Sequence, residues 1–128
     1  DQVILEMSKR KFIIQESNLL ILGLTFKENC PDLRNTKIID LVKTLKNHNV
    51  KIHLVDPNVN IEKAKKVFNL NVHKEIPNGI KFTSILFLVA HDKFKEIDFY
   101  SLNKKLIKDG FIFDLKGLVP KDLNPIRI

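Results

Sequence analysis

The stretch that decides the fold is Asn18-Leu19-Leu20-Ile21-Leu22-Gly23-Leu24, in which four consecutive apolar residues, 19–22, are followed by a glycine. Such a run is typical of a strand whose two faces are both covered by helices. An amphipathic segment follows from Asn35 or Thr36 to Asn47, and residues 50–55 form a second strand-like run. Strand, helix and strand within about forty residues predict a βαβ unit with a right-handed crossover.

The middle of the chain continues the alternation of helices and strands. We expect a short helix over residues 61–68, with Val67 and Phe68 facing inward, and a third short strand that starts at Val72. Residues 83–89 are the second strongly apolar run and predict another buried strand.

The last third of the chain predicts one more helix and one more strand. The helix is expected over residues 100–108, with Leu102, Leu106 and Ile107 buried, and Asp109-Gly110 is expected to end it. Residues 111–114 then form the last clear strand.

Together these elements predict an α/β fold: a three-layer, Rossmann-like, doubly wound and mainly parallel sheet. In such a sheet the loops that leave the strands gather at one edge, where ligands bind. The expected loops follow Leu22, Val55, Val89 and Phe113.

The N-terminal stretch, residues 1–11, carries Val3 and Met7 at helical spacing, and Asp1 is placed to cap a helix. The chain starts without a methionine. We therefore expect residues 1–17 to be a helix and linker from a preceding central region, and residues 18–128 to form a C-terminal domain.

The composition indicates one globular domain, because 128 residues suit a single core and 44% of them are hydrophobic against 29% charged. The longest apolar runs, residues 19–24 and 85–90, are too short to cross a bilayer, and no signal peptide is visible. A single cysteine, Cys30, excludes an internal disulfide and a metal site built from several cysteines. We expect a cytoplasmic protein without a membrane partner.

The net charge of +7, from 22 basic and 15 acidic residues, raises nucleic acid as a possible partner. The lysines, however, are spread through helical segments with acidic residues between them, as in residues 61–67. Spread charge provides no localised track for phosphates, so we favour solvated helix faces over nucleic-acid binding. The excess still favours anionic small ligands.

Lys27 and Arg34 follow the first predicted strand and are the candidate ligand-binding residues. Both could face one diphosphate, with lysine as a point charge and arginine as a bidentate donor. The alternative is that Arg34 pairs with Asp32 or Glu28 and only shapes the loop. The residues by themselves do not separate these two interpretations.

The usual dinucleotide fingerprint is missing, because the first strand exit has only Gly23, followed by bulky residues, in place of Gly-x-Gly-x-x-Gly. We do not expect this domain to hold NAD in the usual way. Asp56 ends the second strand, where such folds keep a ribose-binding acid, but we favour a turn-forming or capping role for it. His91 follows the strand over residues 83–89, and we favour a cap or a hydrogen-bonded loop residue over a residue that lines a site.

Residues 23–37, Gly-Leu-Thr-Phe-Lys-Glu-Asn-Cys-Pro-Asp-Leu-Arg-Asn-Thr-Lys, closely resemble the start of the C-terminal nucleotide-sugar-binding domain of the UDP-glucose/GDP-mannose dehydrogenase family. The family pattern is Gly-x-x-Phe-Lys followed by Asp-x-Arg-x-Ser/Thr. The motif Asn-Cys-Pro-Asp is most similar to that of the family branch that oxidises UDP-N-acetylhexosamines for Vi-type and related surface polysaccharides, such as capsules. Three further motifs, at residues 55–57, 90–94 and 113–117, resemble that branch in the same order.

The resemblance implies a double oxidation of the sugar C6 alcohol to a carboxylate, with two NAD⁺ consumed. It also implies that NAD is bound mainly by an N-terminal Rossmann domain, and that a cysteine from a central region forms a thioester intermediate. Neither region lies in these 128 residues, so no catalytic residue and no metal site are expected here. Cys30 does not match the family nucleophile, and we interpret it as structural or incidental.

By position, Phe26 and Lys27 match residues that contact the nucleotide sugar, and Arg34 matches a residue that reaches the dinucleotide. Lys116 lies where UDP-glucose members commonly carry an arginine near the substrate, so it departs from the pattern. The expected partner is a UDP-N-acetylhexosamine (GlcNAc or GalNAc), in a full-length homodimer. The alternatives are a dehydrogenase for UDP-glucose or UDP-ManNAc, and a stand-alone nucleotide- or phosphate-binding module.

Overall fold

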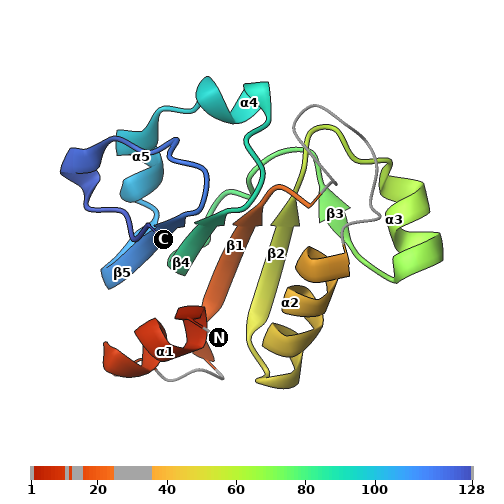
Figure 1. The fold of residues 1–128 in the computed structure, drawn as a ribbon, viewed down its shortest axis with the longest axis horizontal. Helices are drawn as coiled ribbons and strands as arrows, with labels where there is room; N and C mark the ends of the chain where they lie inside the picture. Colours follow the sequence, from red (N-terminus) through yellow and green to blue (C-terminus); the bar gives the residue numbers. More distant parts are fainter. Residues whose placement is uncertain (1, 11, 13–15, 25–35, 128) are drawn as a thin grey trace.

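The computed structural model describes residues 2–10, 12, 16–24 and 36–127, and its centre is a five-stranded sheet with the order β3-β2-β1-β4-β5 (Figure 1). All strand pairs are parallel. The chain builds the sheet outward from β1 through β2 to β3, then crosses over and continues through β4 to β5. The strand order thus reverses between β1 and β4, which confirms the predicted doubly wound architecture. The strands are β1 (Asn18–Leu22), β2 (Lys51–Val55), β3 (Val72–His73), β4 (Phe82–Phe87) and β5 (Leu106–Asp114).

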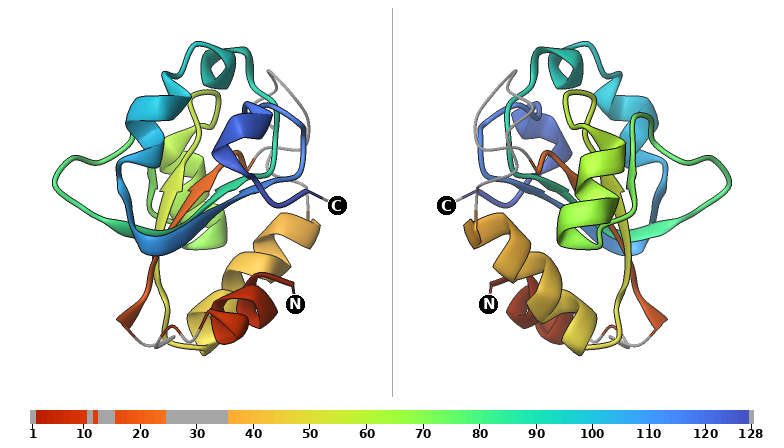
Figure 2. Two further views of the ribbon diagram at one scale, coloured as in Figure 1. Left: turned by 90° about the vertical axis from the view of Figure 1, so that its left-hand side faces the viewer. Right: turned by 90° about the vertical axis from the view of Figure 1, so that its right-hand side faces the viewer.

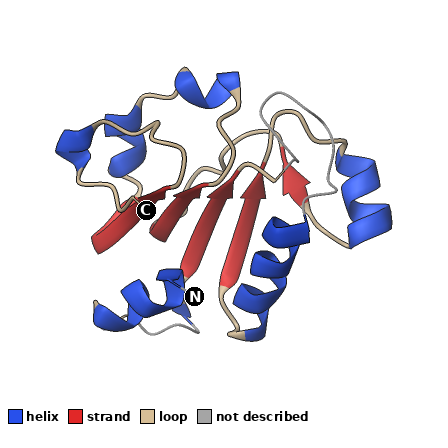
Figure 3. Ribbon diagram, in the orientation of Figure 1, coloured by secondary structure: helices blue, strands red, loops and turns tan. Residues whose placement is uncertain are grey.

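The helices cover both faces of the sheet, as Figures 2 and 3 show, with α1 and α2 on one side and α4 and α5 on the other. Side chains of β1 explain this arrangement. Leu19 and Ile21 belong to the core on the side of α1 and α2, called the first core below, and Leu20 and Leu22 belong to the second core, on the side of α4 and α5. Alternate residues of a strand point to opposite faces, so a strand buried on both faces is apolar throughout. The helices are α1 (Gln2–Lys9), α2 (Thr36–Asn47), α3 (Ile61–Phe68), α4 (Asp92–Lys95), α5 (Phe99–Asn103) and a 3₁₀ turn at Lys121–Leu123.

Helix α3 has the predicted bounds, and local caps explain both of its ends. The Asn60 side chain accepts a hydrogen bond from the Lys63 amide at 3.0 Å, and Asn69 ends the helix in the left-handed conformation. The predicted inward face was wrong at Val67, which is 60% exposed, while Phe68 is partly buried. Ala64 takes the buried position instead and belongs to the first core.

The helix predicted over residues 100–108 was also wrong in its second half. Helix α5 ends at Asn103, and Leu106 and Ile107 are half-buried residues of β5. Strand β5 pairs with β4 on both sides of a register shift, at Leu106 and again from Phe111 onward. Long-range pairing with β4 therefore overrides the helical spacing of these apolar residues.

Helix α1 packs into the first core, where Val3 and Met7 are buried. Arg10, just after the helix, donates a hydrogen bond to the Asp109 carbonyl at 3.0 Å and lies over the Phe111 ring at 5.1 Å. These contacts fasten the start of the chain to β5. A division of the chain after residue 17 stays a prediction.

Among the described residues no helix combines the length and the apolar character that a membrane span requires.

Candidate functional site

The candidate site lies at the carboxyl edge of the sheet, where all five parallel strands end together. Leu22, at the end of β1, is level with Val55 of β2 and with Phe87 of β4. The strand order reverses next to β1, and doubly wound sheets bind ligands at such a position. The residues that follow β1, called the β1 exit here, begin with Gly23 and Leu24 at this position.

Four of the residues singled out in the sequence, Phe26, Lys27, Cys30 and Arg34, lie outside the described part of the chain. Lys116 is described, and it is an exposed residue of the loop that follows β5. The roles that the sequence assigns to these residues therefore stay predictions. The structure describes the ends of β1 and β5, from which the segments that carry these residues leave the sheet.

Gly23 opens the β1 exit with a backbone conformation that suits glycine, since its φ is +100°. A Cβ atom at this position would lie 2.7 Å from both the backbone nitrogen and the Cβ of Val89. The Gly23 amide also donates to the Val55 carbonyl at 3.0 Å. The backbone directly after β1 is thus in close contact with Val55 at the end of β2 and with Val89 after β4.

Asp56 and His91 form a buried pair beside Leu24, just beyond the end of β1. Asp56 directly follows β2, His91 follows β4, and His91 Nε2 lies 2.9 Å from Asp56 Oδ2 with both side chains 0% exposed. The same carboxylate oxygen accepts the Leu24 amide at 2.8 Å. The pair therefore bridges the two strands that flank β1 and contacts the chain as it leaves β1.

The environment of Asp56 favours its ionised form. Burial by itself raises the pKa of this carboxyl, but hydrogen bonds from His91 and from the Leu24 and Asn58 amides, together with the charge of His91, outweigh it. The pKa of Asp56 therefore lies below its ordinary value. An ionised carboxylate only accepts hydrogen bonds, so His91 Nε2 must carry the proton in this contact.

The turn-forming role predicted for Asp56 is confirmed, because its Oδ1 accepts the Asn58 amide at 2.8 Å and the Val59 amide at 3.1 Å. The predicted hydrogen-bonded role of His91 is confirmed as well. Their pairing was missed. A signal for it existed, since the predicted doubly wound sheet gathers the loops after Val55 and Val89 at one edge.

Asp114, at the end of β5, organises the loop that carries Lys116. Its carboxylate accepts the Leu118 amide at 3.0 Å, the Val119 amide at 2.9 Å and Arg127 Nε at 3.2 Å. The Leu115 amide donates to the Phe87 carbonyl at 3.1 Å and holds the start of the loop to β4. The backbone on both sides of Lys116 is thus fastened to the carboxyl edge.

A cavity of about 280 Å³ opens at the same edge beside β2. Phe94 and Ile97 contribute apolar surface, and Lys74 and Lys93 contribute positive charge. The Lys74 ammonium donates to the carbonyls of Pro57 and Val59, so this lysine is already engaged in holding the β2 exit.

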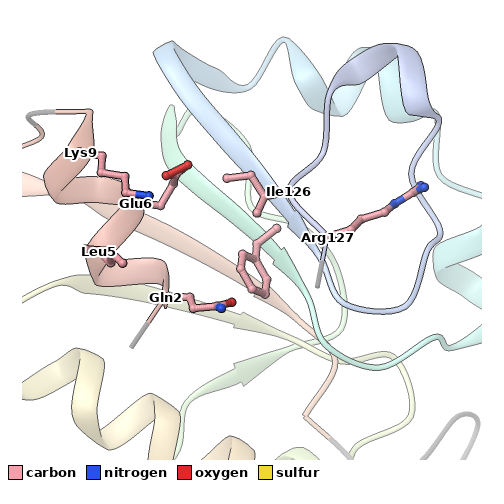
Figure 4. Close-up of a pocket in the computed structure, with 7 residues that line it drawn as sticks. Gln2, Leu5, Glu6, Lys9, Ile126 and Arg127 are labelled. Atoms are coloured by element: carbon pink, nitrogen blue, oxygen red, sulfur yellow. The ribbon is translucent and has the colours of Figure 1, made fainter.

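A second cavity, of about 370 Å³, lies between α1 and the C-terminal residues (Figure 4). Gln2, Leu5, Glu6 and Lys9 of α1 line one side, and Ile126 and Arg127 lie on the opposite side. Arg127 points away from α1, in keeping with its bond to Asp114. Within the described ranges, no cluster of three or more histidine, cysteine or acidic side chains could hold a metal ion.

The family model of the UDP-glucose/GDP-mannose dehydrogenase family, UDP binding domain, matches residues 20–121, which run from within β1 past the end of β5. The chain belongs to this family. The resemblance drawn from residues 23–37 is thereby confirmed, and the UDP binding domain of the family is the part that this chain represents.

Individual proteins agree with this assignment. The chain is 34% identical over 127 residues to a UDP-N-acetyl-D-glucosamine 6-dehydrogenase of Pseudomonas aeruginosa, which covers 99% of this chain. It is 39% identical over 127 residues to Protein CapL of Staphylococcus aureus, which covers 94% of this chain. The chain spans only 30% and 28% of the length of these two relatives.

A solved structure shares the fold of this UDP binding domain. It is an NDP-N-acetyl-D-galactosaminuronic acid dehydrogenase from Methanosarcina mazei, with a TM-score of 0.79 and 15% sequence identity. The similarity covers 94% of this chain and 25% of that structure.

Proposed function

We propose that this chain is the nucleotide-sugar-binding domain of an NAD-dependent UDP-N-acetylhexosamine 6-dehydrogenase. The observation that carries the proposal is the match of the UDP binding domain to residues 20–121, on a sheet whose strand order reverses beside β1. In this proposal the whole enzyme oxidises the sugar C6 alcohol to a carboxylate for a surface polysaccharide. The chain itself holds the nucleotide and performs no step of the oxidation.

Lys27 and Phe26 are proposed to contact the nucleotide sugar, and Lys116 is proposed to approach it from the β5 exit. A lysine ammonium near the diphosphate supplies charge at the end of the substrate that does not react. Binding energy gathered there can hold C6 in position for chemistry carried by other parts of the enzyme. Arg34 is proposed to contact NAD, whose main binding domain lies outside this chain.

The N-acetylhexosamine is the proposed substrate class because a relative covering 99% of this chain is a UDP-N-acetyl-D-glucosamine 6-dehydrogenase. UDP-glucose dehydrogenases are similar at lower identity, 24% for the Arabidopsis thaliana protein. Cytoplasmic location, expected from the sequence, and homodimeric assembly, implied by the family, are further parts of the proposal.

Calorimetric titration of UDP into the chain tests the proposed role of Lys27. Lys27→Ala is expected to weaken UDP binding by about tenfold to a hundredfold, because it removes a charged hydrogen bond to phosphate. Arg34→Ala is the matched control, since it removes the same charge from the same segment. It should change UDP affinity by less than about threefold and instead weaken NAD binding in the longer enzyme.

Equal losses of UDP affinity in the two variants would contradict the separate roles of Lys27 and Arg34. A second titration, with inorganic diphosphate, separates the dehydrogenase domain from a general phosphate-binding module. Binding of diphosphate as tight as that of UDP-N-acetylglucosamine would favour the module.

A further inference from the structure

The two oxygens of the Asp56 carboxylate have different tasks. Oδ1 serves the local turn, since it accepts the amides of Asn58 and Val59, two and three residues further along. Oδ2 serves contacts far away in sequence, the Leu24 amide at 2.8 Å and His91 Nε2 at 2.9 Å. A turn of this kind needs only one oxygen. The second oxygen joins three strand exits to one another.

Stability alone does not explain this second set of contacts. Asp56 and His91 are both fully buried, and removing a carboxylate and an imidazole from water is costly. Replacing buried ionic pairs by apolar residues of similar size is often neutral or stabilising in proteins. A pair of this kind is therefore better explained by the geometry that it imposes.

The geometry imposed is the direction in which the chain leaves β1. Gly23 is held from one side by the close approach of Val89, and Leu24 is held from the other by Asp56 Oδ2. Leu24 is itself 1% exposed, so its side chain adds a third restraint. Two consecutive backbone units are thus fixed at the start of the segment that carries Lys27.

We propose that Asp56 and His91 are positioning residues that lock the β1 exit at Leu24 and thereby set the affinity for the UDP diphosphate. This inference rests on the proposed function for its ligand, whereas the lock itself is defined by the contacts among Leu24, Asp56 and His91. His91 acts through Asp56, because its Nε2–H holds the carboxylate in the orientation that presents Oδ2 to the Leu24 amide.

Asp56→Asn tests the lock, because asparagine can keep its oxygen at the Oδ1 position for the turn while placing an NH₂ group where Oδ2 was. That group donates and cannot accept the Leu24 amide. Asp98→Asn is the matched control: Asp98 Oδ1 accepts the amides of Tyr100 and Ser101, and its Oδ2 accepts Ser101 Oγ. Both substitutions remove one negative charge and keep the side-chain oxygen that accepts the nearby backbone amides.

Hydrogen exchange of single amides gives the first measurement. In Asp56→Asn the Leu24 amide should exchange about tenfold faster, which corresponds to the loss of one hydrogen bond, while the Val59 amide changes little. Asp98→Asn should leave the Leu24 amide unchanged. Unchanged exchange at Leu24 in Asp56→Asn overturns the inference, whatever happens to UDP binding.

UDP titration at a temperature where both variants are folded gives the second measurement. Asp56→Asn should lower UDP affinity about tenfold, since misplacing a binding segment weakens the contacts it makes. Asp98→Asn should leave the affinity unchanged. Faster Leu24 exchange with unchanged UDP affinity would overturn the positioning role, and absence of UDP binding by the unaltered chain would instead refute the proposed function and leave the lock in place.

Two substitutions of His91 keep the test valid if Asp56→Asn does not fold. His91→Leu removes the donor to Oδ2 and should reproduce the faster Leu24 exchange and the weaker UDP binding. His91→Gln keeps an N–H donor at similar reach and should restore both toward the original values. Identical behaviour of these two variants would contradict the role of His91.

Discussion

At the scale of single residues, the β1 exit depends on Gly23 for two separate reasons. Its φ of +100° disfavours any side chain, and a Cβ would meet the backbone nitrogen and Cβ of Val89 at 2.7 Å. Backbone at Val89 is part of the β4 exit and cannot move aside without disturbing the neighbouring hydrogen bond between Leu88 and Leu22. The positive φ and the close approach of Val89 therefore both disfavour a side chain at position 23.

Gly23→Ala is predicted to lower the free energy of unfolding by about 3 kcal/mol, from backbone strain and overpacking combined. Gly79→Ala is the control, because Gly79 also has a positive φ, +78°, but has nothing within 4 Å of an added Cβ. Its loss should be about 1 kcal/mol, from strain alone. Urea denaturation of both variants measures the difference, and equal losses would show that the approach of Val89 has no energetic weight.

At the scale of elements, β5 shows that pairing with a distant strand can override the local helical spacing of apolar residues. Leu106 and Ile107 follow Leu102 at helical spacing, but the Phe82 amide donates to the Lys105 carbonyl at 2.7 Å and draws this segment into the sheet. Asp109 then takes a φ of +64° near the shift in register. Which strand a segment pairs with is not encoded in its own few residues.

Helix α1 is predicted to be an integral part of the folded domain. Met7→Ala should lower the free energy of unfolding by about 2 to 4 kcal/mol, because Met7 is 0% exposed in the first core. Leu5→Ala, on the same helix, removes a side chain that is 55% exposed and should cost less than about 0.5 kcal/mol. Chemical denaturation measures both, and a negligible loss in Met7→Ala would show that residues 1–17 are only a linker.

At the scale of the whole molecule, two cores share one sheet, so each core supports the other. Leu19 and Ile21 face the first core while Leu20 and Leu22 face the second, all within β1. Loss of packing on one face is therefore expected to weaken both. We predict a single cooperative unfolding transition.

Val42→Ala, in α2 of the first core, tests this coupling. The one tyrosine, Tyr100, lies in α5 on the opposite face, and the chain has no tryptophan, so intrinsic fluorescence reports on that face. The variant should shift the urea midpoints of tyrosine fluorescence and of far-ultraviolet circular dichroism together, with a loss of about 2 kcal/mol. A fluorescence curve that stays in place while the circular dichroism curve moves would contradict a single cooperative unit.

The sequence by itself determined the order of the strands and helices through the βαβ unit, because continuous apolar runs and helical spacing are local patterns. It also determined the family, through residues 23–37 and the motifs after three later strands. Asp56 could be assigned to a turn because its partners, the amides of Asn58 and Val59, are close to it in sequence.

Only the tertiary structure decided the register of β5, the inward face of α3 and the lock formed by Asp56, His91 and Leu24. Each of these depends on residues far apart in the chain; the two bonds at Asp56 Oδ2 join positions separated by 32 and 35 residues. Local pattern predicts which residues are buried or turn the chain. Which of them meet is decided by the packing of distant strands, because the free energy of such contacts exists only after the sheet has assembled.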